Sequence, residues 1–350
     1  MRPDTVTVPH PRLLELVAER FRDRGVPDER ARLAASALCH GDLCGFDSHG
    51  VFNLPRLYLP LLDAGRIDPL AEPATRADLG ACATVDAGRA LGLWAAAEAM
   101  DDAIGRAREH GIGLVSVRGA THFGCAGFHA ARATEHGVIG IVASNCGGQR
   151  IARPPLGTMP LLGTNPLAVA APALPDHPFL LDMSTTVVPT GKVRVAADDG
   201  APVPEGWLAD DSGGPVTDPS AFDGGTAHLR WLGGEPETGA YKGFGLGLVV
   251  ELLAALLSGS ALGPTREAVL GDPGRDDDIG YFVLAIDAER LRPGFSEAAR
   301  AMFGAVLDCP PDGGVHYPGW LEAERAMRRR RDGVPVRARL LAELDAAVVA

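Results

Sequence analysis

The sequence predicts an α/β protein in which a β-sheet is covered by helices. Between residues 93 and 183, short apolar runs of strand length alternate with longer segments of helical periodicity. Alternation of this kind is typical of a sheet with helices packed on it. The chain has 350 residues, which corresponds to roughly two domains. Hydrophobic residues make up 46% of it, enough for a sizeable core.

The first 65 residues are expected to be largely helical. Residues 11–23 place their large apolar side chains on one helical face, and Gly25 follows as a stop signal. A second helix is expected from Asp28 to about Leu43, and apolar residues recur at helical spacing again up to Leu61. Two closing helices are expected at 325–331 and 340–349. We therefore predict a helical lobe made of residues 1–79 together with 305–350.

Residues 80–304 are expected to form the sheet domain. The predicted helices are 93–110 and 125–136, and the predicted strands are 112–117, 138–143, 167–171, 179–182 and 281–286. Residues 199–240 are rich in Gly, Pro and Asp and predict a long irregular segment. The apolar run 243–263 contains Glu251, whose charge argues against a membrane span, so we expect a buried core helix there.

Composition excludes several classes of function. The net charge of −12 disfavours nucleic acid and anionic membranes as partners. The six cysteines show no metal-ligand spacing, and the polar N-terminus carries no secretory signal, so we expect no metal and a cytoplasmic protein. The sequence also has no dinucleotide GxGxxG, Walker, GxSxG or HExxH motif in a suitable context.

Several short polar motifs fall at expected strand ends and helix starts, where ligands of α/β sheets bind. They are DSHG at 47–50, THFG at 121–124, SN at 144–145, GTNP at 163–166, DMS at 182–184, GK at 191–192 and YKG at 241–243. In this order, and over nearly the whole chain, they resemble the type-2 malate/L-lactate dehydrogenase family, which also contains imine reductases. The resemblance implies a fold that binds NAD or NADP without the usual dinucleotide fingerprint.

The resemblance also implies roles for individual residues. His49 matches the family's proton donor, with Ser48 as its orienting partner. A histidine suits proton transfer near neutral pH. Lys192, which replaces an aspartate of the imine-reductase branch, is expected to lower the pKa of His49 and to hold a substrate oxygen. Thr164 matches a substrate-contacting position. The expected cofactor-binding residues are His122, Phe123, Gly124, Cys125, Ala126, Ser144, Asn145, Asp182, Met183, Ser184, Lys242, Gly243, Pro318 and Gly319.

Two positions depart from the family pattern. Asn53, which with Lys192 is a candidate to hold the substrate, stands where the family carries an arginine that grips the substrate carboxylate. Arg56 lies three residues on, on nearly the same helical face, and is a candidate to replace it. Trp320 follows Pro318 and Gly319 where the family has a glutamate.

These features predict reversible hydride transfer between NAD(P)H and a small 2-oxo or 2-hydroxy acid, or a related polar carbonyl compound. The resemblance further implies a homodimer with the site near the subunit contact. In it, the helical lobe is expected to bind substrate and form the dimer contact, and the sheet domain is expected to bind the cofactor. Reduction of a C=N bond in amino-acid or specialised metabolism is the first alternative. A non-catalytic nucleotide-binding protein is the second. The choice between NAD and NADP stays open, with Arg150, Arg153 and Arg194 as candidate partners for a 2′-phosphate.

Overall fold

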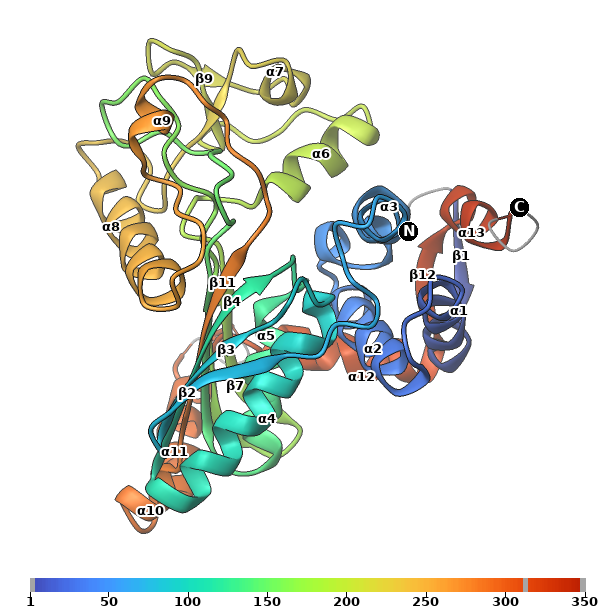
Figure 1. Ribbon diagram of the computed structural model, residues 1–350, viewed down its shortest axis with the longest axis vertical. Helices are drawn as coiled ribbons and strands as arrows, with labels where there is room; N and C mark the ends of the chain where they lie inside the picture. Colours follow the sequence, from blue (N-terminus) through green and yellow to red (C-terminus); the bar gives the residue numbers. More distant parts are fainter. Residues whose placement is uncertain (1–3, 311–313, 347–350) are drawn as a thin grey trace.

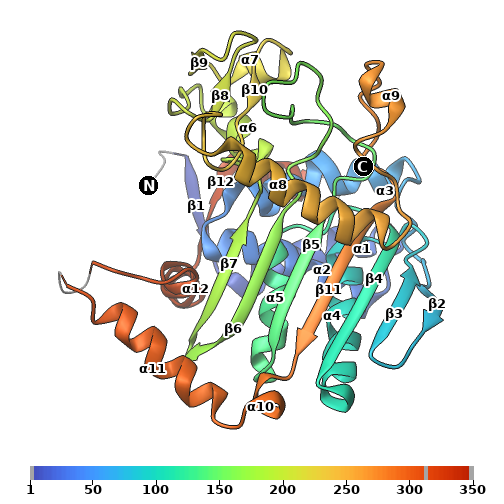
Figure 2. The ribbon, with the colours of Figure 1, turned by 90° about the vertical axis from the view of Figure 1, so that its left-hand side faces the viewer.

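The centre of the molecule is a seven-stranded sheet (Figures 1 and 2). The computed structural model describes residues 4–310 and 314–346. The strands, in their order across the sheet, are β2 (Ala74–Asp78), β3 (Cys82–Asp86), β4 (Ile112–Ala120), β11 (Ile279–Ile286), β5 (Ile139–Ser144), β6 (Leu167–Leu174) and β7 (His177–Met183). Neighbouring strands are antiparallel, except that β3 and β4 are parallel.

The predicted α/β class is confirmed, and so is the expectation of a sheet unlike the usual parallel dinucleotide fold. Strand β11 lies between β4 and β5 and is antiparallel to both. Strands β4 and β5, which helix α5 connects, are therefore not hydrogen-bonded to each other. Strands β2 and β3 were not predicted. All of β2 is exposed and its sequence is ATRAD, so it carries no apolar alternation that would reveal a strand.

Two helices cover one face of the sheet, α4 (Gly92–His110) and α5 (Ala126–Glu135). Both approach the strands closely because glycines face them. A Cβ at Gly113 of β4 would lie 2.0 Å from the carbonyl oxygen of Ala103, and one at Gly140 of β5 would lie 2.3 Å from that of Ala130. Helix α4 ends at Gly111 in the left-handed conformation, as the sequence predicts.

The opposite face is crossed near one end by α8 (Ala240–Val250), which continues as a π-helix at Glu251–Leu256, and near the other end by α11 (Phe295–Leu307) (Figure 2). The expectation of a buried core helix after Lys242 is wrong. Leu252 and Leu256 are 54% and 56% exposed. The helix is apolar on every side. One side packs on the sheet, and the other side exposes a stripe of apolar side chains.

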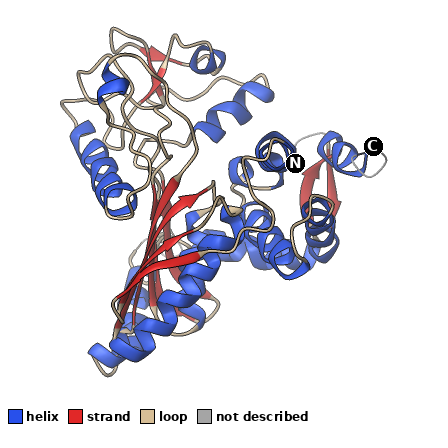
Figure 3. Ribbon diagram, in the orientation of Figure 1, coloured by secondary structure: helices blue, strands red, loops and turns tan. Residues whose placement is uncertain are grey.

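The helical lobe begins with α1 (His10–Arg22) and α2 (Asp28–Cys44), followed by 3-10 turns at Asp47–His49 and Val51–Asn53, a π-helix at Leu54–Tyr58 and α3 (Leu59–Asp63). Both ends of the chain meet here, because β1 (Thr5–Val8) pairs with β12 (Val334–Arg337) (Figures 1 and 3). Helix α12 (Trp320–Asp332) packs on α2, and α13 (Ala338–Ala346) follows β12.

The expected boundary at residue 79 falls in the turn between β2 and β3, and the one at 304 falls inside α11; the division into two units remains a prediction. The last residues of the expected closing helix, 347–349, lie outside the described part of the chain.

A third region, residues 184–278, lies above the sheet edge (Figure 1). It contains α6 (Thr190–Asp198) and the single-turn helices α7 (Ser220–Asp223) and α9 (Arg266–Val269). It also contains the short strands β8 (Leu208–Ala209), β9 (Pro215–Val216) and β10 (His228–Leu229). Helix α10 (Ala288–Leu291) lies apart from it, after β11. Segment 199–240 is mostly irregular, as predicted. Within residues 4–310 and 314–346, no helix has the length and hydropathy required to cross a membrane.

His129 on α5 makes stability dependent on pH. Its side chain is fully buried, its Nε2 donates to the carbonyl oxygen of Phe123 (2.8 Å), and burial lowers its pKa from 6.5 to about 3. Between these pKa values the unfolded chain binds a proton that the folded chain does not, so stability falls as the pH falls. We expect His129→Gln to reduce the slope of unfolding free energy against pH by up to about 1.4 kcal/mol per pH unit.

Urea unfolding at several pH values between 4 and 7.5 measures this slope. The matched control is His136→Gln, which changes an exposed histidine at the end of the same helix. Equal slopes in the wild type and His129→Gln would show that His129 does not remain neutral in the folded protein.

Candidate active site

A cavity of about 460 Å³ lies between the helical lobe, the sheet edge and α6. Strands β4, β5 and β7 run in the same direction, so their carboxyl ends meet at this edge and bring three of the polar motifs together. The predicted site residues that line the cavity are Ser48, His49, Asn53, Arg56, His122, Phe123, Gly124, Cys125, Ala126, Ser144, Asn145, Thr164, Asp182, Met183, Ser184 and Lys192.

The loop that carries His49 is held from behind by Asp42. Helix α2 ends at Gly45, whose left-handed φ of +85° turns the chain into the loop. The buried Asp42 carboxylate accepts a hydrogen bond from the backbone N–H of Val51 (2.7 Å) and leaves no room for a side chain at Gly50. Burial raises the pKa of Asp42 to about 7. The sequence analysis did not identify Asp42, since an acid inside a helix gives no local signal.

The His49 imidazole is a neutral base in the free protein. Its Nδ1 lies 2.9 Å from the Ser48 hydroxyl, which matches the predicted orienting contact. Burial lowers the pKa of His49 to about 3, with smaller contributions from His122 and Lys192. The expected effect of Lys192 therefore has the predicted direction, although burial is the larger cause.

A second imidazole, that of His122, lies parallel to His49 with ring centres 6.1 Å apart. Its Nδ1 accepts from the backbone N–H of Gly124 (3.2 Å) and lies 2.7 Å from the Tyr58 hydroxyl. Because a backbone N–H can only donate, Nδ1 is unprotonated, and the neutral ring carries its proton on Nε2. Burial lowers the pKa of His122 to about 4. Tyr58 was missed because it occupies an ordinary apolar position of its helix.

Helix α6 brings Lys192 to the loop that carries His49. A Cβ at Gly191 would lie 2.8 Å from the Cβ of Ser48 and 2.9 Å from its carbonyl oxygen, so only glycine permits this approach. Asn53 donates from Nδ2 to the same carbonyl oxygen of Ser48 (2.8 Å). Arg56 stacks over Phe52 at 4.1 Å and donates to its carbonyl oxygen (3.2 Å).

Asp182 joins the end of β7 to the start of α5. Its Oδ2 accepts from the backbone N–H of Gly127 (2.8 Å), and burial raises its pKa to about 6. The N–H of Gly127 is therefore already engaged within the protein. The cavity has the volume of a small-molecule site. Its lining combines apolar side chains with three cationic residues, Arg56, Lys192 and Arg194, which suits a nicotinamide ring beside a small acid.

Behind the cavity, three buried polar residues form a connected network. Asn145 Nδ2 donates to the carbonyl oxygen of Ala261 (2.8 Å) and lies 3.4 Å from Glu251, while its Oδ1 accepts from the backbone of Gly147 and Gly280. Asn165 Nδ2 donates to Glu251 (2.8 Å). The amide of Asn145 and the Ser144 hydroxyl, which donates to the carbonyl of Asn145, are thus used within the protein.

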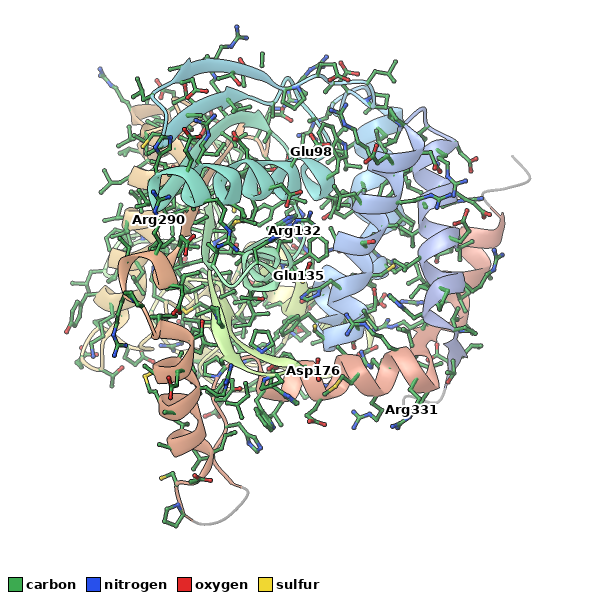
Figure 4. The ribbon with its side chains drawn as sticks, turned by 90° about the horizontal axis from the view of Figure 1, so that it is seen from below. Glu98, Arg132, Glu135, Asp176, Arg290 and Arg331 are labelled. Atoms are coloured by element: carbon green, nitrogen blue, oxygen red, sulfur yellow. The ribbon has the colours of Figure 1, made fainter. Side chains whose placement is uncertain are left out.

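Four expected cofactor residues lie outside the cavity lining. Lys242 is exposed at the start of α8, and Gly243 packs against the backbone of Leu232 and Thr185. The carbonyl of Pro318 accepts from Leu180, and Gly319 borders a second cavity of about 640 Å³. Figure 4 labels two acids that also line this second cavity, Glu135 on α5 and Asp176 in the β6–β7 turn.

The three arginines considered for a 2′-phosphate are all engaged. Arg150 donates to the backbone of Gly263 and Asp272, Arg153 pairs with Asp211, and Arg194 pairs with Asp223. Of these, only Arg194 lines the cavity. In the part of the chain that the structure describes, no group of three His, Cys, Asp or Glu side chains is placed to hold a metal ion.

The family model for malate/L-lactate dehydrogenases matches residues 8–345. The chain belongs to this family. It is 33% identical over 348 residues to the malate dehydrogenase of Pyrococcus horikoshii, covering 97% of this chain and 94% of that one. It is 35% identical to the (2R)-3-sulfolactate dehydrogenase (NADP(+)) of Chromohalobacter salexigens, covering 88% and 87%.

The structure of this family member is also similar to known ones. The crystal structure of the malate dehydrogenase from Entamoeba histolytica superposes with a TM-score of 0.90 at 28% identity, over 98% of this chain and 97% of that one. The predicted family and fold class are thereby confirmed. The roles of the individual site residues remain predictions.

Lys192→Met should raise the pKa of His49, because the ammonium group disfavours a second positive charge nearby. The expected measurement is the NMR titration of the His49 ring protons, assigned by their loss in His49→Ala. Arg76→Met, which removes a positive charge from the exposed strand β2, is the control and should leave the titration unchanged. An unchanged or lower pKa in Lys192→Met would contradict the placement of Lys192 beside His49.

Proposed function

We propose that this protein is a nicotinamide-dependent oxidoreductase that interconverts a small 2-hydroxy acid and the corresponding 2-oxo acid. The observation that carries the proposal is the neutral His49 imidazole, oriented by Ser48 and facing a cavity that also contains Lys192. The names of the relatives, malate dehydrogenase and sulfolactate dehydrogenase, support this class of substrate. Free cysteines at all six positions agree with a cytoplasmic location.

His49 and His122 have different roles in the proton transfer and hydrogen bonding of the proposed reaction. NAD or NADP, when bound, takes up or supplies the hydride. In the oxidative direction, neutral His49 accepts the proton of the substrate hydroxyl at Nε2 while Nδ1–H donates to Ser48. His122, with its proton on Nε2, supplies a second hydrogen-bond donor for a substrate oxygen. In the reductive direction, a bound carboxylate near His49 raises its pKa and so favours the protonated donor.

The substrate carboxylate requires a cation, and Asn53 does not provide one. Its amide is uncharged, and one of its two N–H groups already donates to the carbonyl of Ser48. We assign the carboxylate to Lys192, with Arg56 as the second cation of the lining. Because Asn53 replaces the expected arginine, reduction of an imine or of a neutral carbonyl remains the alternative, and a binding protein without activity remains the second.

His49→Ala should lower the turnover of a 2-oxo acid by about 10²- to 10⁴-fold, which is the usual contribution of a general acid or base. The assay follows the loss of NADH or NADPH absorbance with malate- and sulfolactate-type oxo acids, cyclic imines and neutral diketones. Turnover of oxo acids that is lost in His49→Ala supports the proposal. Turnover of imines or neutral carbonyls alone would favour the first alternative, and no turnover by the wild type would favour the second.

We further propose that the protein is a homodimer formed through the face crossed by α8. The π-helix and the residues around it present Leu248, Val249, Leu252, Leu256 and Leu257 as exposed apolar side chains. Beside them, apolar residues of the sheet such as Ile141, Leu167 and Leu284 are only half-buried. A contiguous apolar surface of this kind is typical of a protein–protein interface, and continuity with the sheet suits a second copy of the same face.

Leu252→Arg combined with Leu256→Arg should convert the dimer to a monomer, because two charges would be buried in the apolar interface. Sedimentation velocity at several concentrations measures the state. The control, Leu79→Arg with Leu291→Arg, charges two exposed leucines outside this face. A wild-type protein that sediments as a monomer at all concentrations would contradict the proposal.

A further inference from the structure

Helix α6 is held at both ends by the helical lobe. Its first turn places Gly191 against Ser48, as described above. Its other end carries two acids, Asp198 and Asp199, that face the C-terminal part of the chain. The remainder of α6 packs into a separate apolar cluster through Val193, which joins residues such as Leu208 and Leu229. Helix α6 thus bridges the irregular region and the lobe that carries His49.

The anchor at the second end is Arg337, the last residue of β12. Its Nη2 donates to Asp199 (2.8 Å) and its Nη1 forms an ion pair with Asp198. Arg339 also pairs with Asp198. The Arg337 side chain is only 11% exposed, so water and salt screen its pairs less than they screen a surface pair. These residues are 138 or more positions apart in the sequence.

The same guanidinium also touches the cavity wall. It lies 5.7 Å from the centre of the Phe52 ring, whose other neighbour is the Arg56 guanidinium at 4.1 Å. Phe52 and Arg56 both line the cavity, as does Lys192 on α6. Arg337 therefore contacts both elements between which the substrate would lie: the loop after His49 and the helix that carries Lys192.

We infer that Arg337 is a positioning residue for the active site: by binding Asp198 and Asp199, it fixes α6 so that Lys192 faces His49 and the substrate carboxylate. The part of this inference that concerns the substrate carboxylate rests on the proposed function. The part that concerns the position of α6 rests on the structure alone. Among the residues that the structure describes, none forms a hydrogen bond or an ion pair with the exposed Lys192 side chain, so its position depends on the helix that bears it. Gly191 permits the approach of α6 but makes no bond that would hold it.

Arg337→Met removes the two ion pairs of Arg337, leaves the pair between Arg339 and Asp198, and keeps an apolar stem near Phe52. We expect the KM for the oxo acid to rise about tenfold with little change in kcat, because a carboxylate contact stabilises the bound substrate and the transition state alike. Arg337→Lys, which retains the charge, should restore part of the loss. Raising the salt concentration should increase the KM of the wild type more than that of Arg337→Met.

The matched control is Arg106→Met. Arg106 is 14% exposed and also pairs with two acids, Asp78 and Asp102, but it joins α4 to β2, away from the cavity. Thermal unfolding should show similar losses of stability in both variants. A rise in KM in Arg337→Met but not in Arg106→Met supports the inference, and equal KM values in all proteins would overturn it.

A readout without turnover separates this inference from the proposed function. The groups that act on the charge of His49 are His122, from the loop after β4, and Lys192, from α6, while Ser48 bonds the ring. If Arg337→Met releases α6, Lys192 moves away and the pKa of His49 rises in the NMR titration. An unchanged titration would overturn the positioning role even if the enzyme is active, and a shifted one would support it even if no oxo acid is reduced.

Discussion

Burial of the His49 imidazole beside a lysine is the constraint on which the rest of the site depends. A histidine in water is partly protonated near neutral pH, whereas burial keeps His49 neutral and able to accept a proton. The ring lines the cavity, and the protein supplies the contacts that orient it. Ser48 does so directly, and Asp42 does so indirectly by holding the backbone of the same loop. The cavity floor is built in the same way, since Tyr58 and Gly124 fix the tautomer of His122.

The second requirement is close approach of chain segments that are distant in sequence. Glycine provides it at Gly191, where α6 meets Ser48, and at Gly113 and Gly140, where helices meet the sheet. Buried polar contacts then hold the segments together. Glu251 connects the π-helix after α8 to Asn145 and Asn165 at the sheet edge, which explains an acid in the middle of an apolar run. Its buried carboxylate is satisfied by three donors, including the backbone N–H of Gly263.

Much of the fold could be predicted from the sequence because periodicity reports burial. Strands such as β4 and β5 bury most of one face. Helices such as α4 end at a glycine, which adopts the left-handed conformation that stops the helix. The same reasoning failed for β2, which buries nothing, and for α8, where an apolar surface looks the same in sequence as an apolar core. For the site, short polar motifs located the cavity residues, but Asp42 and Tyr58 act through contacts that only the folded chain creates. The sequence also could not show that the Asn145 amide is bonded to Ala261 and Glu251 within the protein.

The distribution of lysine and arginine in this chain supports the proposal that Lys192 binds a substrate oxygen. Of 33 basic residues, only Lys192 and Lys242 are lysines, and the others are arginines. Where a positive charge or a bidentate contact suffices, as at Arg337 or Arg106, this protein uses a guanidinium. An ammonium group is smaller and more strongly hydrated, and it binds as a point charge. A lysine at position 192 therefore fits the proposal of a compact cation that contacts one oxygen of a substrate next to His49.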